Sequence, residues 1–287
     1  NPELEKGMMT SIFEYAKDGR WTKPFPQHDM GTYPQANGQT YTGDMPVEEG
    51  GNMLTLAAEI CRIEGNTNYV KPYWDLLKTW ADYLAENGQD PVNQLCTDDF
   101  AGHWAHNANL SAKAIMGVAA YGILCKLDGR AQDAEKYLAT AKKMAEQWKK
   151  DAADGDHYRL AFDRPDTWSQ KYNLVWDKLW GLNMFDDVME KEINYYLKKQ
   201  NVYGLPLDCR KGYTKSDWIL WTACMAKDKE TFKKFVSPVY KLYSETTSRV
   251  PMSDWFETEK PVWVSFRARS VIGGFWFKVL MDKNDNK

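Results

Sequence analysis

The chain has 287 residues and a formal net charge of −3, with 43% hydrophobic and 27% charged residues. These values are typical of a globular protein with a large core, and they offer no basic surface for nucleic acid. No uninterrupted apolar run reaches the roughly 20 residues that cross a bilayer. A nucleic-acid partner and a membrane span are therefore not expected.

Helical periodicity recurs from end to end, whereas strand patterns are nearly absent. The pattern predicts ten helices, over residues 3–17, 48–65, 69–86, 107–127, 131–150, 172–184, 187–199, 216–226, 230–244 and 267–281. Odd-numbered helices are amphipathic, and even-numbered ones are apolar nearly all round, as in residues 114–125. A helix that is apolar on every side must be covered on every side. The even-numbered helices are therefore expected to form an inner layer.

The connections alternate as well, because even-to-odd links are short and odd-to-even links are long. This alternation predicts an all-α fold, an α/α toroid of helical hairpins with five long loops at one rim. Inner helices would present their unpaired N–H groups there. A ring of six hairpins needs two more helices than the ten predicted here, so we expect the missing hairpin to precede Asn1. Residues 1–287 are then one toroid domain of a longer polypeptide.

Five widely spaced cysteines form no CxxC pair and no ligand cluster, so neither a metal site nor a disulfide framework is indicated. Cys61, Cys125 and Cys224 lie in apolar helical patterns and are expected to be core thiols. No cofactor is expected.

The first long loop carries His28 and Asp29 and ends at Glu48 and Glu49. Two carboxylates in a first helical turn can simply complement the helix dipole. A role in binding substrate fits Glu48 and Glu49 equally well. Asp29, beside a histidine and followed by glycine and proline turns, is harder to explain by structure alone.

The second loop concentrates acids, imidazoles and an indole: Asp98, Asp99, His103, Trp104 and His106. The two histidines resemble an HxxH metal pair, but no third ligand is nearby. A carboxyl site with supporting imidazoles is the better interpretation, because one of two adjacent acids can be kept protonated by the other.

The tripeptide Ser-Asp-Trp occurs twice, at residues 216–218 and 253–255. Serine as N-cap with aspartate in the first turn explains the first copy. No strong helix follows the second copy, which makes Asp254 a candidate for chemistry. Arginines near both copies would hold carboxylates of the protein or of a substrate. The candidate binding residues of these loops are Asp208, Arg210, Asp217, Trp218, Arg249, Trp255, Arg267 and Arg269.

No serine-hydrolase elbow, phosphate-binding loop or dinucleotide-binding glycine pattern is present. The chain has 13 Trp and 16 Tyr, whose flat faces with one polar atom suit sugar rings. Acids on separate loops together with aromatic residues are the constellation of glycoside hydrolysis. By residue chemistry alone, a carbohydrate-active hydrolase is the leading hypothesis.

The loop motifs also resemble the glutaminase A-like family. Those that carry the resemblance are His28-Asp-Met-Gly-Thr-Tyr-Pro34, Pro46-Val-Glu-Glu-x-Gly-Asn-Met53, Leu95-Cys-Thr-Asp-Asp-Phe-x-Gly-His103, Gly204-x-Pro-Leu-Asp-x-Arg210, Lys215-x-Asp-Trp218, Thr247-x-Arg-Val-Pro-x-Ser-Asp-Trp-Phe256 and Arg267-x-Arg-Ser-Val-x-Gly-Gly274. The resemblance implies a secreted protein, outside the cell or in the periplasm, with β-rich domains upstream in the same polypeptide. It also implies hydrolysis of L-glutamine to glutamate and ammonia.

The fold implied by the resemblance is that of the six-hairpin glycosidases, and it leaves the reaction open. By position in that fold, Asp98 or Asp99 would be the acid and Asp254 the base of an inverting glycosidase. A glutaminase would instead need an activated hydroxyl or thiol. Thr97 and Cys96 are available for this role, but no adjacent Lys or His marks either as activated. The third alternative is a non-catalytic module that binds a saccharide.

Overall fold

The computed structural model describes residues 1–97, 99–248 and 252–285. Its contacts divide the chain into two compact units, Asn1–Trp148 and Lys149–Lys287. We refer to them as the N-terminal and C-terminal units and describe each by itself. Two predicted site residues, Asp98 and Arg249, lie outside the described residues.

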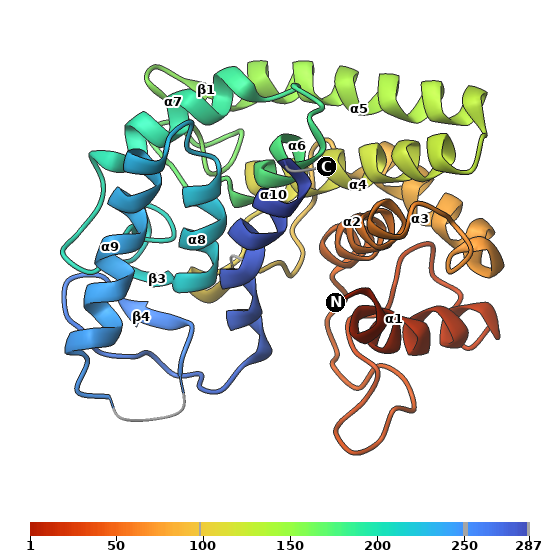
Figure 1. Cartoon of the computed structure of the whole chain (residues 1–287), viewed down its shortest axis with the longest axis horizontal. Helices are drawn as coiled ribbons and strands as arrows, with labels where there is room; N and C mark the ends of the chain where they lie inside the picture. The colour runs from red at the N-terminus through yellow and green to blue at the C-terminus, as the bar shows by residue number, and fades with distance from the viewer. Residues whose placement is uncertain (98, 249–251, 286–287) are drawn as a thin grey trace. The chain divides into compact units, whose positions relative to one another are not determined.

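The N-terminal unit is built from helices (Figure 1). They are α1 (Pro2–Lys17), α2 (Pro46–Glu64), a 3-10 turn η1 (Lys71–Tyr73) leading into α3 (Trp74–Asn87), η2 (Asp99–Ala101), α4 (Ala108–Leu127) and α5 (Ala131–Ala152), which extends into the next unit. Asn1 and Asn107 cap α1 and α4, each accepting a backbone N–H with its side chain. Gly65 closes α2 in the left-handed conformation.

Helix α4 is the buried centre of this unit. Among the described residues it is the one helix long and apolar enough to cross a membrane, yet 83% of its most apolar window is buried inside the protein. That burial is what a core helix requires. The predicted inner position of this segment is confirmed, because α4 packs against both α2 and α3.

Two glycines allow α2 and α4 to approach closely. A Cβ added to Gly117 of α4 would lie 3.1 Å from the Cα of Gly51 on α2. A Cβ added to Gly51 would lie 2.4 Å from Cγ of Lys113. The absence of both side chains therefore brings the aliphatic stem of a lysine directly against the backbone of the neighbouring helix.

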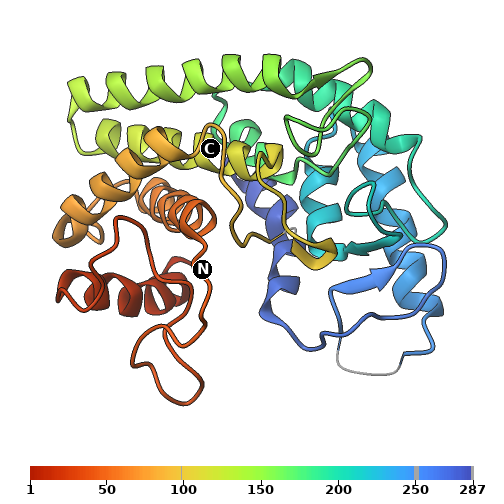
Figure 2. The same ribbon diagram turned by 180° about the vertical axis from the view of Figure 1, so that it is seen from behind.

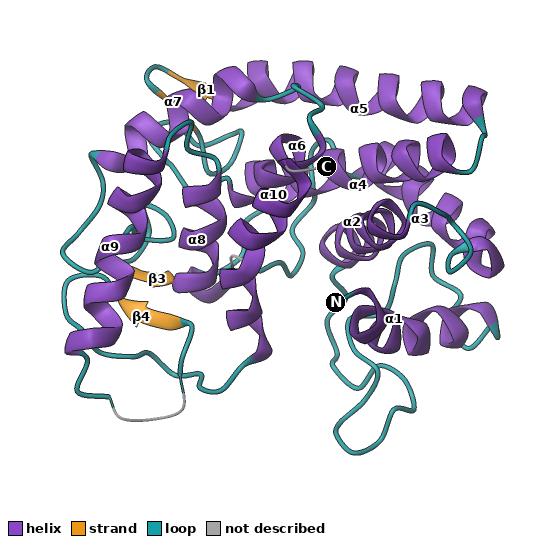
Figure 3. Ribbon diagram, in the orientation of Figure 1, coloured by secondary structure: helices purple, strands orange, loops and turns teal. Residues whose placement is uncertain are grey.

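The C-terminal unit mixes short strands with helices (Figure 3). In chain order the elements are β1 (Ala153–Asp154), β2 (His157–Tyr158), η3 (Tyr172–Leu174), α6 (Val175–Trp180), α7 (Asp186–Leu197), β3 (Tyr213–Lys215), α8 (Ser216–Cys224), α9 (Lys229–Glu245), β4 (Trp255–Glu257), η4 (Ser270–Trp276) and α10 (Phe277–Asp285). Strands β1 and β2 form an antiparallel hairpin, and β3 pairs antiparallel with β4. Helix α8 packs against α9, η4 and α10, and it lies between α9 and α10 in both Figure 1 and Figure 2.

The predicted all-α class is confirmed, but three of the ten helices differ from their predicted extent by more than two residues. Helix α3 begins at Trp74 rather than at residue 69, after the 3-10 turn η1. Helix α6 ends at Trp180 because Gly181 and Asn183 both adopt positive φ angles. The last helix was predicted from residue 267, whereas a 3-10 turn begins at Ser270 and the α-helix only at Phe277. The Gly273-Gly274 pair in this turn has poor helix propensity. Closure of a ring and a single toroid domain stay predictions.

Within each unit, long loops meet at the first turn of a buried helix. In the N-terminal unit the Gln94 side chain accepts the Val47 amide at 3.0 Å, which joins the second loop to the start of α2. In the C-terminal unit the Ser216 amide donates to the Asp254 carbonyl at 2.8 Å, at the start of α8. Loops that the sequence places far apart therefore deliver their polar side chains to the same helix ends.

Candidate functional site

A buried carboxylate at the start of α2 holds a hydroxyl and an ammonium group. Glu48 is 3% exposed. Its Oε1 accepts a hydrogen bond from Lys113 Nζ of α4 at 2.7 Å. The same oxygen accepts a hydrogen bond from the hydroxyl of Thr97 in the second loop. The sequence shows no adjacent activating residue for Thr97, and the structure supplies the Glu48 carboxylate of α2 as the acceptor of its hydroxyl.

Two further side chains continue this network. Lys113 Nζ also donates to Asn52 Oδ1 at 2.7 Å. The Asn52 amide in turn donates to Glu49 Oε2 at 3.4 Å. We call the five side chains the Thr97 cluster: Thr97, Glu48, Lys113, Asn52 and Glu49. Thr97, Asn52 and Glu49 are partly exposed, so the cluster is buried at the ion pair and open at its edge.

Glu49 is held in the neutral form over an unusual pH range. Burial raises the pKa of its carboxyl to about 7, and the adjacent Glu48 carboxylate raises it further, against weaker opposition from Asn52 and Lys113. A carboxyl that titrates near neutrality can donate or accept a proton at physiological pH. The cluster thus combines a hydroxyl, a paired carboxylate and a titrating acid.

His28 and Asp29 organise the first loop. Asp29 accepts the amides of Gly31, Thr40 and Tyr41 at 2.8 to 3.0 Å. His28 Nδ1 lies 3.0 Å from Asp29 Oδ2, and its ring stacks on Tyr41 at 4.5 Å. Burial would raise the pKa of Asp29, but these hydrogen bonds outweigh it and hold the pKa well below its usual range. Because three backbone amides of the same loop donate to Asp29, this carboxylate fixes the conformation of the loop.

The acids of the second loop are only partly described. Asp99 begins the turn η2, and its side chain, like all of Asp98, is outside what the structure describes. His103 is exposed and Trp104 partly buried. His106 Nδ1 lies 2.7 Å from Asp90 Oδ1. Among the described residues, no three His, Cys, Asp or Glu side chains are grouped as metal ligands.

A second charged cluster lies at the start of α8. Asp254 is fully buried, and its Oδ2 lies 2.7 Å from Lys215 Nζ. Arg269 Nε donates to Asp254 Oδ1 at 3.1 Å, and a second guanidinium nitrogen bonds Oδ2. Burial alone would raise the pKa of Asp254, but Arg269 and Lys215 lower it. Asp254 is therefore an ionised carboxylate with a cation on each oxygen.

Asp217 lies in the same cluster, but its pKa is raised whereas that of Asp254 is lowered. It is 1% exposed, and burial raises its pKa to about 7, with a further contribution from the Asp254 carboxylate against Lys215 and Arg269. The Lys215 pKa is itself lowered by burial. Two carboxyls whose environments separate their pKa values are a signature of functional sites.

The other predicted residues of the C-terminal unit contact the protein itself. Arg210 clamps Asp208, with Nε to Oδ1 at 3.0 Å and Nη2 to Oδ2 at 2.6 Å. Arg267 is exposed and lies over the Trp263 ring at 4.4 Å. Trp255 contacts the rings of Tyr213 and Phe266, and Trp218 stacks on Tyr172. Among the described residues, both oxygens of the Asp208 carboxylate accept hydrogen bonds from the Arg210 guanidinium.

Lys113, Asn52, Lys215 and Tyr172 were not among the predicted site residues. One signal could have found Lys113, because it is a lone charge in a helix that is otherwise apolar all round. A lysine at such a position needs a buried partner. Asn52 and Tyr172 carry no comparable signal, since their roles depend on which neighbour the fold brings to them.

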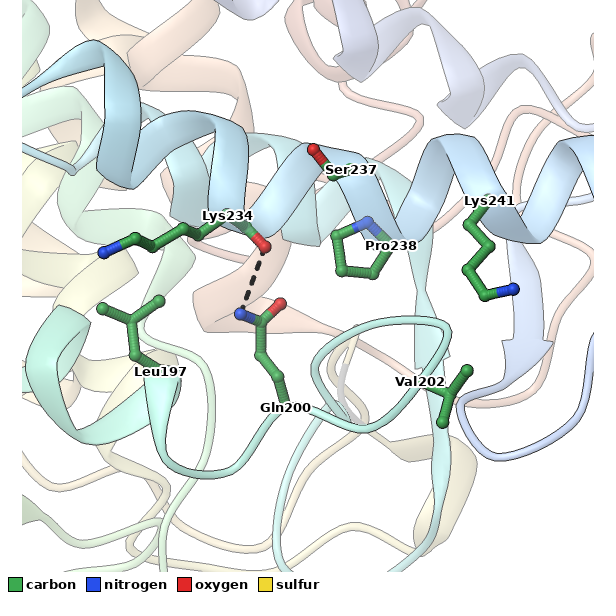
Figure 4. A pocket seen from close by; sticks show the side chains of 7 residues that line it. All are labelled: Leu197, Gln200, Val202, Lys234, Ser237, Pro238 and Lys241. Carbon is green, nitrogen blue, oxygen red and sulfur yellow. Dashed lines mark hydrogen bonds between the residues drawn. The ribbon is translucent and has the colours of Figure 1, made fainter.

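A surface groove in the C-terminal unit is lined by residues without a carboxyl or thiol group. It is lined by residues of the α7 end, the following loop and α9, among them Leu197, Gln200 and Pro238 (Figure 4). Pro238 has no N–H to donate, which frees the Lys234 carbonyl four residues earlier. Gln200 Nε2 donates to that carbonyl at 3.2 Å. Its lining contains no acid or thiol, so the Thr97 cluster remains the better candidate for catalysis.

The fold consists of buried helices flanked by amphipathic ones. Charged clusters lie at the starts of buried helices, where the long loops meet them. These features define a helical-hairpin protein with polar sites built from its loops. The family model described as "Glutaminase A six helical-hairpin domain" matches residues 1–279, and the chain belongs to this family.

Two proteins are similar in sequence to this chain over nearly all of its length. "Glutaminase A" of Aspergillus oryzae is 33% identical over 285 residues, covering 96% of this chain and 41% of that protein. "Probable glutaminase" of Arthroderma benhamiae is 25% identical over an alignment of 379 positions, covering 100% of this chain and 44% of that protein. The chain thus spans less than half the length of these relatives.

Proposed function

We propose that this chain is a glutaminase A-like hydrolase that cleaves a small primary carboxamide, such as that of L-glutamine, at the Thr97 cluster. The observation that carries the proposal is the hydrogen bond from the Thr97 hydroxyl to Glu48, a carboxylate held in place by Lys113. The printed names of the two relatives point to the same substrate class.

The cluster contains a hydroxyl nucleophile and a base, two of the parts that acyl transfer needs. Thr97 Oγ1 attacks the carboxamide carbon while the hydroxyl proton passes to Glu48. The attack forms an ester between Thr97 and the acyl group and releases ammonia. Water then attacks the ester: its hydroxyl forms the carboxylic acid and its second proton passes to Thr97 Oγ1. Glu48 gives up the proton it took from Thr97, and Glu49 regains from solvent the proton that it gave to ammonia. Lys113 orients Glu48 through its hydrogen bond to the oxygen that Thr97 contacts, and Asn52 fixes the ammonium in turn.

Glu49 supplies the second proton-transfer group. The leaving nitrogen must gain a proton to depart as ammonia, and burial raises the pKa of Glu49 to about 7, so this carboxyl is partly protonated at neutral pH. An acid whose pKa lies near the working pH is the most effective proton donor. Glu49 adjoins Glu48 in sequence and shares Asn52 with Lys113, so both carboxyls belong to one network.

The contacts of Asp254 favour this chemistry over an inverting glycosidase. The base of such an enzyme must contact a water that attacks the sugar. Asp254 has no exposed surface and holds a cation on each oxygen, and its pKa is lowered. Asp254 would therefore have to exchange a cation for the attacking water, whereas Glu48, although also buried and ion-paired, already accepts a hydrogen bond from the Thr97 hydroxyl. The roles of Asp98 and Asp99 as acids stay predictions.

The direct test measures ammonia release from L-glutamine by the purified 287-residue chain. Thr97→Ala should lower kcat by about a thousandfold or more, as loss of a catalytic nucleophile does. Thr97→Ser keeps the hydroxyl and should keep measurable activity. Cys209→Ser, which changes an exposed thiol, is the matched control.

Two outcomes count against the proposal in different ways. Full activity of Thr97→Ala would exclude the hydroxyl mechanism. Absence of ammonia release from a panel of primary amides by the wild-type chain would exclude the function itself. Added hydroxylamine should capture the ester as a hydroxamate, which a direct attack of water on the amide would not produce.

A further inference from the structure

Three buried polar atoms gather on the first two turns of α8 without a protein partner. They are Asp217 Oδ1, Trp218 Nε1 and Trp221 Nε1, and none has a hydrogen bond within the described part of the chain. Leaving a buried polar group unsatisfied costs about 1–3 kcal/mol. Three such atoms on neighbouring side chains of one short helix indicate that a molecule outside the protein completes them.

Aromatic rings enclose the same place. Trp218 stacks on Tyr172 of η3 with ring centroids 4.1 Å apart and planes 5° from parallel. Trp221 meets Trp218 edge to face at 5.0 Å. Gly274 of η4 closes the other side, because a Cβ there would stand 3.1 Å from Trp221 Nε1 and 3.2 Å from Asp217 Cβ. The backbone of η4 thus reaches both side chains only because residue 274 has none.

The unpartnered atoms restrict the chemistry of the ligand. Two indole N–H groups need an acceptor, and a carboxyl oxygen needs a donor when Asp217 is ionised. An ammonium group cannot accept, and a carboxylate cannot donate. The neighbouring charges also leave little need for a charged ligand, because Lys215 and Arg269 are both paired with Asp254. A neutral group that both donates and accepts meets these needs, and a sugar hydroxyl and a primary carboxamide are both of this kind, but only the sugar adds an apolar ring face for the indoles.

We propose that α8, η3 and η4 form a binding site for a neutral saccharide, recognised by Asp217, Trp218 and Trp221. Each sugar hydroxyl both donates and accepts, so neighbouring hydroxyls satisfy the carboxyl and the indole N–H groups together. The apolar C–H face of a pyranose ring packs on the partly exposed indole rings. This site uses no residue of the Thr97 cluster and is independent of the proposed amide hydrolysis.

Binding should be visible in tryptophan fluorescence. The three polar atoms are buried, and two of them belong to indole rings, so a sugar that reaches them must shift an indole. We expect a saturable change with at least one of glucose, galactose, N-acetylglucosamine and cellobiose, at concentrations up to about 100 mM, since weak sugar sites bind in the millimolar range. L-Glutamine, which carries a primary carboxamide, is the comparator. No turnover is needed, so the outcome does not depend on the proposed hydrolysis.

Calorimetry on matched variants then locates the site. Trp221→Phe removes an unpartnered N–H while keeping a ring, and Asp217→Asn keeps the size of the side chain. Each should weaken saccharide binding about fivefold or more, the effect of losing one hydrogen bond. Tyr240→Phe and Asp156→Asn are the controls, because both alter exposed side chains of the same unit, outside α8, η3 and η4.

Three results would overturn the proposal. One is the absence of binding by every saccharide of the panel. Another is equal affinity in the wild-type chain, Trp221→Phe and Asp217→Asn. The third is competition in which L-glutamine occupies the site and the sugars do not, since that would assign the atoms to a carboxamide instead.

Discussion

Lys113 and Glu48 form an ion pair across α2 and α4, with Nζ and Oε1 2.7 Å apart and side chains only 6% and 4% exposed. Burying two charges costs more than their attraction returns unless further hydrogen bonds complete them. Thr97 and Asn52 provide those bonds, one to each partner. The ion pair therefore depends on the Thr97 hydroxyl, which is also the proposed nucleophile. The same hydrogen bond contributes to the stability of the fold and to the proposed catalysis.

Lys113→Met should destabilise the N-terminal unit strongly. The apolar stem of the lysine is retained, but Glu48 becomes a buried carboxylate without its cation. Breaking a buried pair from one side costs about 3–5 kcal/mol. Urea denaturation followed by circular dichroism measures the change in the free energy of unfolding.

A double variant separates charge from packing at this position. Adding Glu48→Gln to Lys113→Met removes the unpaired charge and should recover a large part of the loss. Lys143→Met on the exposed face of α5 is the control and should change stability little. If the double variant is as unstable as the sum of the single ones, packing and not the ion pair dominates.

Gly51→Ala tests the close approach of α2 to α4. The new Cβ would stand 2.4 Å from Lys113 Cγ and 3.2 Å from the Lys113 carbonyl oxygen, so the helix or the lysine must move. Overpacking of this kind costs about 1–3 kcal/mol, and displacement of the ammonium should also lower any amidase activity. Thermal melting and ammonia release measure the two effects.

Gly7→Ala on α1 is the matched control for this substitution. A Cβ at Gly7 meets nothing within 4 Å, and alanine is the better helix former by about 0.5–1 kcal/mol. The same change should therefore stabilise at Gly7 and destabilise at Gly51. Equal effects at the two positions would contradict the packing argument.

Sequence periodicity predicts most of the fold here because the helices are long and their buried faces are distinct. The buried position of α4 follows from its uniform apolarity, and the placement of Glu48, Glu49 and Asp217 at helix starts follows from the loop lengths. The identity of the partners does not follow. Lys113 is 65 residues from Glu48 in sequence, and only the packing of two glycines brings them together. Composition also cannot show that Asp254 is fully buried and paired with two cations.

The C-terminal unit should lose stability as the pH rises through neutrality. Burial raises the pKa of Asp217 from 3.8 to about 7, so the folded state binds this proton more tightly than the unfolded state does. The resulting stability is fully present below about pH 4 and is lost as the pH rises through 7. Asp217→Asn should flatten this slope and raise the melting temperature at pH 8 by several degrees.

Thermal melts between pH 5 and 8 measure the effect, with Asp156→Asn as an exposed control. Part of the slope should persist in Asp217→Asn, because the pKa of Asp177 is also raised by burial, to about 6. A steeper slope in Asp217→Asn than in the wild-type chain would show that Asp217 is ionised in the folded state well below neutrality.

Thiol labelling should detect one reactive cysteine in the folded chain. All five cysteines lie in the described residues, and Cys209 is exposed while the other four are buried. Burial raises the pKa of Cys61 and Cys224 to about 12 and that of Cys125 to about 11. Ellman's reagent should therefore react with one thiol in the native state and with five in denaturant. Cys209→Ser should abolish the native reaction, and rapid labelling of a second site would contradict the described burial.

The pH dependence of the proposed amide hydrolysis should report Glu49. If the protonated carboxyl of Glu49 delivers the proton to ammonia, kcat should fall about tenfold per pH unit above a pKa near 7. Glu49→Gln cannot donate that proton and should lower kcat by about a hundredfold while removing this dependence. Glu135→Gln, which changes an exposed acid on α5, should leave the profile unchanged. An unaltered alkaline limb in Glu49→Gln would assign the proton donor to another group, while the Thr97→Ala result would still decide the nucleophile.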